Sequence, residues 1–233
     1  MNVRLLKAPD RPEEAITVAA KICYSDKTFE EIERQVTRES AYKFVRMLKS
    51  LGHDSALEHV SFTFGIEGIS RAATHQLVRH RLASYSQQSQ RYVSMEHADF
   101  VMPESIAGSE QARQLFSSCL EMIRKTYSEL NNLNIPKEDA RYILPNACMS
   151  NIVVTMNARE LLHFFQLRCC TRAQWEIRDL AQKMLDLVQQ AAPVVFENAG
   201  PECVRTSCPE GKMSCGQAKQ MRIRYHTHSA QNE

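Results

Sequence analysis

The chain lacks a strong net charge, long apolar runs and internal repeats. Its formal charge over 233 residues is only +2 at pH 7, too little to attract nucleic acid to the molecule as a whole. The opening residues MNVRLLK lack the apolar run and small-residue cleavage site of a signal peptide, and no later stretch has the length of a membrane span. We therefore expect a cytoplasmic protein that binds a small molecule, with no nucleic-acid partner and no membrane partner.

The eight cysteines do not predict disulfide bonds, because a secretion signal is lacking and the chain is long enough to bury a core without covalent links. Cys23, Cys119 and Cys148 stand among apolar neighbours, which is typical of small buried side chains. A further group lies near the C-terminus and offers the alternative of a peripheral structural zinc site, although its gaps lack paired CxxC spacing. This group comprises Cys203, Cys208 and Cys215, with His226 or His228.

Hydrophobic residues make up 43% of the chain and charged residues 24%, which is typical of a globular protein with one substantial core. Strand patterns occur at Val3–Leu6, Val60–Ile66 and Ile152–Met156, whereas Ser84–Val93 is polar enough to be a loop or an edge strand. Helical patterns fill most of the remainder. They begin after Pro12, at Arg38–Leu51, at Ser70–His80, at Ser109–Leu130, after Pro136, after Asn157 and at Arg172–Gln190.

These patterns predict an α/β (α+β) fold in which a mixed sheet packs with several long helices. We expect one catalytic domain over residues 1–199 and a Cys-containing basic tail over 200–233. Asn157 is expected to cap a helix, with Glu160 reaching back to the cap amide. Two apolar stripes are expected to pack inward: Leu115, Cys119, Met122, Ile123 and Leu130 in one helix, and Trp175, Leu180, Met184, Leu187 and Val188 in another.

No Asp or Glu occurs from Gly68 to Met95, yet this segment holds Arg71, Arg79, Arg81 and Arg91 with His75 and His80. In a helix, Gln76, Arg79 and His80 would share one face. Arginine suits phosphate because its rigid fork offers paired donors, and nearby Ser and Gln side chains suit a polar ring. The segment therefore predicts an anion site. The alternative is a solvated basic surface whose arginines pair with carboxylates elsewhere in the chain.

The residues Arg79-His80-Arg81-Leu82-Ala83-Ser84, followed by Ser89-Gln90-Arg91, resemble the RHRxxSxxxxSxR signature of the flavin-dependent thymidylate synthases at every specified position. The resemblance covers most of the span from Val3 to Phe196. It includes Gly52-His53, Glu58-His59, Arg141 before Leu144-Pro145, Asn157-Ala158-Arg159, Leu167-Arg168 and Ala173-Gln174-Trp175-Glu176.

The resemblance implies a homotetramer with shared active sites, in which FAD lies between subunits beside the uracil of dUMP. NADPH would reduce FAD, methylenetetrahydrofolate would supply the one-carbon unit, and no metal would be required. Arg168 matches the catalytic arginine that faces uracil and favours its ionised form. The implied FAD-binding residues are Ser55, Arg79, His80, Arg81, Gln87, Asn157, Ala158, Arg159 and His163. The implied dUMP-binding residues are Gln76, Arg79, Gln87, Gln88, Ser89, Gln90, Arg91, Arg141 and Arg168.

Four positions depart from the family pattern. Gln87 stands where Glu is common, Gln90 where Gly is common, His163 where Asn is often found and Arg172 where His is often found. These departures affect the fine geometry of the nucleotide loop and of the flavin edge. Ser89 lacks a dedicated base nearby in the sequence, so we expect it to bind the nucleotide rather than act as a nucleophile.

Three other functions compete with this interpretation. A catalytic metal site would draw on His53, Glu58, His59, His75 and His80, but their spacings match no familiar zinc framework. A nucleic-acid module would use the basic segment and Lys212–Arg224, with only Tyr85 and Tyr92 for base stacking. The strongest alternative is an NADPH-dependent flavin reductase without methyl transfer, which would leave Arg141 and Arg168 without a nucleotide to bind.

Overall fold

A computed structural model describes residues 1–227 of the chain as two compact units, each made of separate segments. Unit 1 comprises Met1–Asn2, Ile66–Arg79 and Tyr85–Val153. Unit 2 comprises Val3–Gly65, His80–Ser84 and the chain from Val154 onward. The predicted bounds of a single domain at 1–199 and a tail from 200 stay a prediction.

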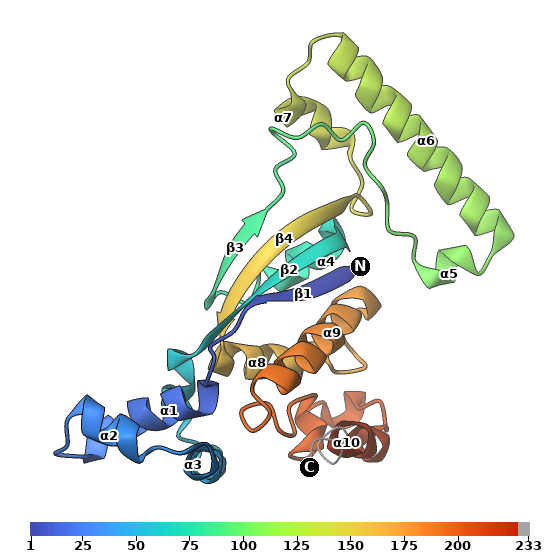
Figure 1. Ribbon diagram of the computed structural model, residues 1–233. Helices are drawn as coiled ribbons and strands as arrows, with labels where there is room; N and C mark the ends of the chain where they lie inside the picture. Colours follow the sequence, from blue (N-terminus) through green and yellow to red (C-terminus); the bar gives the residue numbers. More distant parts are fainter. Residues whose placement is uncertain (228–233) are drawn as a thin grey trace. The chain divides into compact units, whose positions relative to one another are not determined.

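Four strands form one sheet in the order β1-β2-β4-β3: β1 Asn2–Lys7, β2 Ser61–Ser70, β3 Ala83–Gln87 and β4 Met149–Asn157 (Figure 1). The sheet is antiparallel, not mixed as predicted. Its register shows this, because the amide of Ala158 donates to the carbonyl oxygen of Val60, whereas Gly68, later in β2, meets Asn151, earlier in β4. The three predicted strands are confirmed, and the polar segment after Leu82 forms an edge strand.

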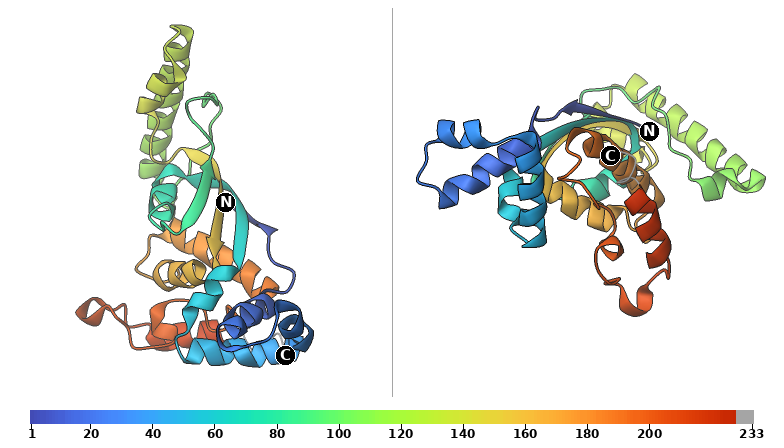
Figure 2. Two further views of the ribbon diagram at one scale, coloured as in Figure 1. Left: turned by 90° about the vertical axis from the view of Figure 1, so that its left-hand side faces the viewer. Right: turned by 60° about the horizontal axis from the view of Figure 1, so that its bottom comes forward.

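Unit 2 contains most of the hydrophobic core. Phe62 of β2 contacts Phe196, with ring centroids 5.4 Å apart, and Phe165 contacts Phe196 at 5.9 Å. The blue helices α1, α2 and α3 lie side by side in both views of Figure 2. The helices of this unit are α1 Pro12–Lys21, α2 Phe29–Gln35, α3 Arg38–Ser50, α8 Ala158–Arg168, α9 Trp175–Ala191 and α10 Ala218–Thr227, with 3-10 turns η1 Ile22–Tyr24, η2 Asp54–His59, η4 Glu202–Val204 and η5 Gly211–Met213.

Unit 1 has a smaller core around Tyr127, which packs with Met95, Ala140 and Cys148. Tyr127 is the one buried residue of the long helix α6. The helices of this unit are α4 Arg71–Leu77, α5 Glu104–Ala107, α6 Glu110–Asn132 and α7 Lys137–Ala140, followed by the 3-10 turn η3 Arg141–Ile143. None of the helices within residues 1–227 is both long and apolar enough to cross a membrane.

Two predicted apolar stripes differ from the structure. In α6, Leu115 is 68% exposed, Met122 is 70% exposed and Cys119 is exposed too, so these three lie outside the core of the single chain, whereas Leu130 packs against the core around Tyr127 as predicted. In α9, Leu180, Met184 and Val188 are buried as predicted, but Trp175 is 38% exposed because it stands at the first turn of the helix. Among the cysteines, Cys148 is buried as predicted, whereas Cys23 is exposed.

Helix ends correct two further predictions. Asn157 caps α8 as predicted, its side chain accepting from the amide of Glu160, but the Glu160 carboxylate binds His80 instead of the cap amide. Helix α4 ends at Leu77 rather than His80, and the hydroxyl of Tyr85 donates to the carbonyl oxygen of Leu77. Since Arg79 and His80 follow the helix, the prediction that they share a helical face with Gln76 is wrong.

Candidate functional site

The centre of the candidate site is a chain of three polar side chains in unit 2. The Glu160 carboxylate lies 2.9 Å from Nδ1 of His80, and Nε of Arg168 donates to Nε2 of His80 at 3.1 Å. His80 and Glu160 are buried, and Arg168 is half-buried at the end of α8. Because Arg168 Nε–H donates to Nε2, that nitrogen must accept, so the proton of the imidazole lies on Nδ1 and is donated to Glu160.

This arrangement keeps His80 neutral. Burial lowers the pKa of His80, and the nearby charge of Arg168 lowers it further, while the hydrogen bond with Glu160 opposes both. A neutral imidazole with its proton on Nδ1 is the form that accepts from Arg168. Glu160 therefore fixes the tautomer of His80, and His80 fixes the orientation of the Arg168 guanidinium.

Helix α8 places these groups by its periodicity. Glu160, His163, Phe164 and Arg168 lie at spacings of three and four residues, which puts them on one side of a helix. The edge of the Phe164 ring packs against His80 with centroids 4.9 Å apart, and His163 contacts His80 at 5.8 Å. Sequence reasoning missed Glu160 as a site residue. The signal was present, since an acid two turns before Arg168 shares its side of the helix.

A cavity of about 770 Å³ lies beside this chain of side chains in unit 2. Three predicted cofactor residues line it: Asn157, Arg159 and His163. Ala158 is buried beneath them, and Ser55 lies in η2 between two lining residues, Asp54 and Glu58. The size is within the range of sites that hold drug-sized ligands and cofactors.

Four residues that line this cavity were not predicted from the sequence. Lys49, from α3, and Glu202, Arg205 and Thr206, from the C-terminal segment, line the same cavity. Arg159 pairs with Glu58, and Arg205 lies 3.8 Å from Glu202. Cations from three separate segments therefore face one cavity, with acidic partners beside them. Sequence periodicity could not place the C-terminal segment here.

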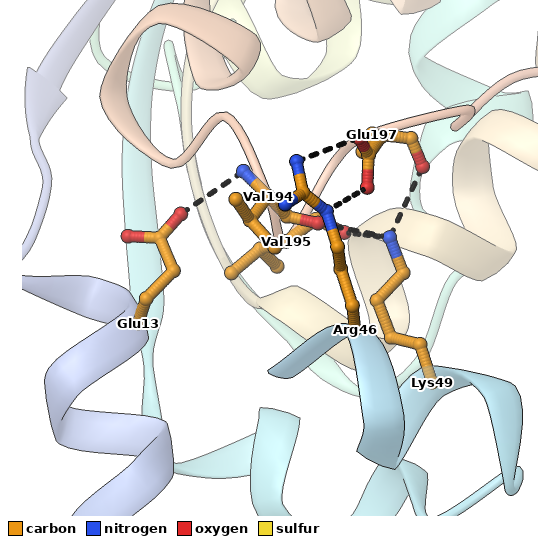
Figure 3. A network of polar contacts seen from close by, with 6 residues as sticks. All are labelled: Glu13, Arg46, Lys49, Val194, Val195 and Glu197. Carbon is orange, nitrogen blue, oxygen red and sulfur yellow. Dashed lines mark hydrogen bonds and ion pairs between the residues drawn. The ribbon is translucent and has the colours of Figure 1, made fainter. Parts of the chain in front are cut away.

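Lys49 belongs to a polar network with Arg46, Glu197 and the backbone of the segment after α9 (Figure 3). The ammonium of Lys49 donates to the carbonyl oxygens of Val194, Val195 and Glu197 at 2.9–3.0 Å, and Arg46 forms a paired contact with the Glu197 carboxylate. Burial lowers the pKa of Lys49 to about 8. The network ties α3 to the segment that follows α9.

The remaining predicted site residues lie in unit 1, on and after β3. Gln87 donates to the hydroxyls of Thr74 and Ser150 at 3.1 and 3.2 Å. The Gln87 side-chain amide donates both hydrogen bonds, whereas the carboxylate of the Glu that is common in the family could only accept. Gln at this position therefore still ties the loop to Thr74 and Ser150. The backbone N–H of Gln88 donates to the carbonyl oxygen of Asn151, which continues the pairing of β3 with β4 one residue beyond β3.

Gln90 and Ser89 have local partners. The Gln90 side chain is buried and lies 3.6 Å from the sulfur of Cys148, and the Ser89 hydroxyl accepts from the amide of Arg91 at 3.1 Å. Gln76, in α4, is half-buried. Their assignments to the nucleotide stay predictions.

Two predicted dUMP-binding arginines lie near Glu138 in unit 1. Arg91 pairs with the Glu138 carboxylate at 2.7 Å, and Arg141 donates to the backbone carbonyl oxygen of Glu138 at 3.1 Å. Arg91 and Arg141 are thus both held at α7. The competing interpretation, a basic surface whose arginines pair with carboxylates, describes the Arg91 side chain in this structure. An exposed pair of this kind contributes little stability and is readily exchanged for a phosphate.

The structure divides the predicted residues between its two units. Unit 1 holds Gln76, Arg79, Gln87, Gln88, Ser89, Gln90, Arg91 and Arg141, which is the dUMP set without Arg168. Unit 2 holds Ser55, His80, Arg81, Asn157, Ala158, Arg159, His163 and Arg168, which is the cofactor set with Arg168 and without Arg79 and Gln87. Arg79 and Arg81 are exposed on either side of the buried His80. Arg172, the fourth departure, binds Glu210 and Met213 of the C-terminal segment instead of the cavity.

Comparisons with known proteins give the family of the chain. The family model described as "Thymidylate synthase complementing protein" matches residues 4–194. A flavin-dependent thymidylate synthase from Geobacter sulfurreducens is 51% identical over 224 residues, covering 95% of this chain and 97% of the relative. The enzyme of that name from Clostridium tetani is 46% identical, with 97% of each chain covered, and that from Pyrococcus abyssi is 43% identical, with 91% of each covered. Given the match over both units, this chain belongs to the flavin-dependent thymidylate synthase family.

Proposed function

We propose that this protein methylates dUMP to dTMP, with methylenetetrahydrofolate as one-carbon donor and FAD passing a hydride from NADPH. The observation that carries the proposal is the Glu160–His80–Arg168 chain beside a cavity lined by predicted cofactor residues. A guanidinium held from behind by a neutral imidazole has its remaining donors fixed in direction. Such fixed donors are the kind that stabilise charge developing on a substrate.

Arg168 is the catalytic residue of this proposal. When the nitrogen between its two carbonyl groups is deprotonated, uracil carries negative charge on that nitrogen and on the carbonyl oxygens, and a guanidinium offers paired donors to such a group. Arg168 would bind the ionised base and raise the electron density at the ring carbon to be methylated. The positioning residues Glu160 and His80 keep the guanidinium in place, so that little reorganisation is needed during the reaction.

The dUMP phosphate would bind to Arg91 and Arg141, displacing the Arg91 contact with Glu138. Both arginines already lie at Glu138, and arginine forks match phosphate geometry. The Gln87–Ser89 segment would contact the rest of the nucleotide. Ser89 already accepts a backbone hydrogen bond, which suits a binding role.

The cavity in unit 2 fits part of FAD. Its volume of about 770 Å³ and its basic side chains Arg159 and Arg205 suit a ligand with a pyrophosphate. Bound FAD supplies the transfer of reducing equivalents, which protein side chains cannot provide. Asn157, Arg159 and His163 would hold it, with Ser55 and Arg81 at the margins.

A homotetramer with shared sites forms part of the proposal. The exposed apolar side chains of α6, Leu115 and Met122, are the kind of surface that association buries. In the single chain both side chains are exposed.

The test is one reaction mixture in which dTMP and NADPH are both followed. Purified protein receives dUMP, methylenetetrahydrofolate and NADPH, with and without added FAD. The proposal predicts dTMP formation that requires FAD and matches NADPH consumption. Consumption of NADPH without dTMP would instead establish the flavin reductase alternative, and the assignments of Arg91, Arg141 and Arg168 to a nucleotide would be withdrawn.

A further inference from the structure

Four thiols line one small cavity in unit 2. Cys203, Cys208 and Cys215 of the C-terminal segment surround it together with Cys170, which follows α8. The cavity has a volume of about 10 Å³, room for roughly one water-sized sphere. All four cysteines are free thiols. The fold thus adds Cys170, more than thirty positions earlier in the sequence, to the three cysteines that the sequence pattern singles out.

Four thiols around one cavity suit a divalent cation. A bound cation removes the repulsion between neighbouring thiolates and holds them in the ionised form.

The loop that carries these cysteines has no core of its own. From Arg205 to Gln217 not one residue is buried, and Cys208 is the only half-buried one. Side chains from outside tie the loop at its margins: Arg222 donates to the carbonyl oxygens of Cys203 and Thr206, and Arg172 binds Met213 and Glu210. Short segments without an apolar core commonly owe their fold to a structural metal.

A hydroxyl in the wall of the cavity supports a charged occupant. Thr171 lines the cavity, and its buried hydroxyl lies beside the thiol of Cys215. Arg172, next along the chain, also lines the cavity. A hydroxyl and a guanidinium both donate hydrogen bonds, which suits them to stabilise metal-bound thiolates without themselves binding the metal.

We propose that Cys170, Cys203, Cys208 and Cys215 bind one zinc ion, which fixes the C-terminal segment against the end of α8. Four cysteine thiols give the closed, tetrahedral set of a structural site, with no position left for a substrate. Binding releases the four thiol protons, so that Zn²⁺ and four thiolates leave a local charge of about −2, which Arg172 and the Thr171 hydroxyl offset in part.

The four cysteines take up their metal-binding arrangement when the cation binds, and they are not preformed for it. Within residues 1–227 no three His, Cys, Asp or Glu side chains already stand in a metal-ligating arrangement. Each cysteine has a single side-chain torsion, and the loop between Arg205 and Gln217 is exposed, so closure requires only local movement. Of the earlier candidates His226 and His228, the side chain of the first and the whole of the second lie outside the described residues.

The test measures zinc in the full-length protein, purified with its thiols kept reduced. We expect about one zinc ion per chain in the wild type, and a loss of at least roughly tenfold in Cys208→Ala and Cys170→Ala. Cys23→Ala and Cys119→Ala are matched controls, because both thiols are exposed and outside the cluster, and they should keep zinc at the wild-type level.

Replacement of zinc by Co²⁺ gives a second readout that does not need the variants to fold. The wild type should show the intense visible bands and the thiolate charge-transfer band of a tetrahedral four-sulfur site. The proposal is overturned if the reduced wild type neither retains zinc nor takes up Zn²⁺ or Co²⁺ on titration. Equal zinc in the cluster variants and the controls would overturn it too, as would a disulfide between any two of the four cysteines in the protein isolated under non-reducing conditions.

Discussion

At the scale of single residues, the account depends on one imidazole with a fixed proton. Burial and Arg168 keep His80 neutral, and Glu160 holds its proton on Nδ1. The arrangement makes Glu160 a positioning residue, although it was not expected to belong to the site. Its contribution should be visible in turnover rather than in nucleotide binding.

Replacing Glu160 tests this. In Glu160→Ala the Nδ1 proton of His80 has no acceptor, the imidazole can move its proton to Nε2, and Arg168 loses its fixed partner. We expect kcat to fall by about 10²-fold, the size of effect that misplacement of a catalytic group produces, with little change in dUMP affinity. Glu160→Gln should recover part of the activity because its amide oxygen still accepts from Nδ1. Unchanged kcat in Glu160→Ala would contradict the positioning role, and the exposed Glu39→Gln serves as control.

Ser89 gives a second prediction at this scale. Its hydroxyl accepts from the amide of Arg91, as a residue that shapes a binding loop would. Ser89→Ala should therefore retain measurable turnover, with a weaker affinity for dUMP as the main effect. Steady-state kinetics measure the turnover of Ser89→Ala, and equilibrium binding measures its affinity for dUMP. Complete loss of turnover with normal dUMP binding would make Ser89 a nucleophile instead.

At the scale of elements, α3 is held to the segment after α9 by one buried ammonium. Lys49→Met leaves three buried carbonyl oxygens without a donor, so the free energy of unfolding should fall by about 1–3 kcal/mol. Lys43→Met, on the exposed side of the same helix, should change it by less than about 0.5 kcal/mol. Chemical denaturation of both variants measures the difference, and equal effects would contradict the network.

The same lysine gives a pH dependence with a definite sign. Its pKa in the folded state is about 8, below the usual value of 10.5. Between these values the unfolded state binds more protons, so the contribution of Lys49 to the free energy of unfolding rises with pH, by at most roughly 1.4 kcal/mol per pH unit. The wild type should therefore gain stability over Lys49→Met from pH 8 to 10. If the difference in the free energy of unfolding between wild type and Lys49→Met instead narrows from pH 8 to 10, the lowered pKa of Lys49 is contradicted.

Sequence patterns predicted most elements because each has its own local signal. Strand alternation marked β2, Asn157 marked the start of α8, and the Ser70 cap marked α4. The features that were missed depend on contacts distant in sequence. Glu160 was expected at the cap amide but found a partner 80 positions away, and Cys170 joins a cluster from another segment. Periodicity also cannot tell a buried stripe from an exposed one, since Leu115 and Met122 of α6 follow the predicted spacing but are exposed.

At the scale of the whole molecule, the exposed stripe of α6 predicts association. Met122→Lys places a charge on the stripe and should shift the protein toward smaller assemblies in analytical ultracentrifugation. Glu121→Lys places the same side chain about 100° around the helix and should leave the assembly unchanged. If both variants sediment like the wild type, the stripe is not an interface and the proposed homotetramer needs another surface.

The division of the predicted residues between two units also belongs to this scale. The dUMP set lies in unit 1 and most of the cofactor set, with Arg168, lies in unit 2. The proposed reaction needs both sets, and within the proposal Arg168 is the residue that binds the uracil ring during the chemistry.

The most direct test of the account therefore compares wild type and Arg168→Ala for dTMP formation, in the presence of FAD, NADPH, methylenetetrahydrofolate and saturating dUMP. FAD content and NADPH-dependent flavin reduction are measured in the same preparations. The account predicts that Arg168→Ala binds and reduces FAD like the wild type but forms dTMP at least about 10²-fold more slowly. Wild-type dTMP formation by an Arg168→Ala protein that retains its flavin would contradict the central role of Arg168.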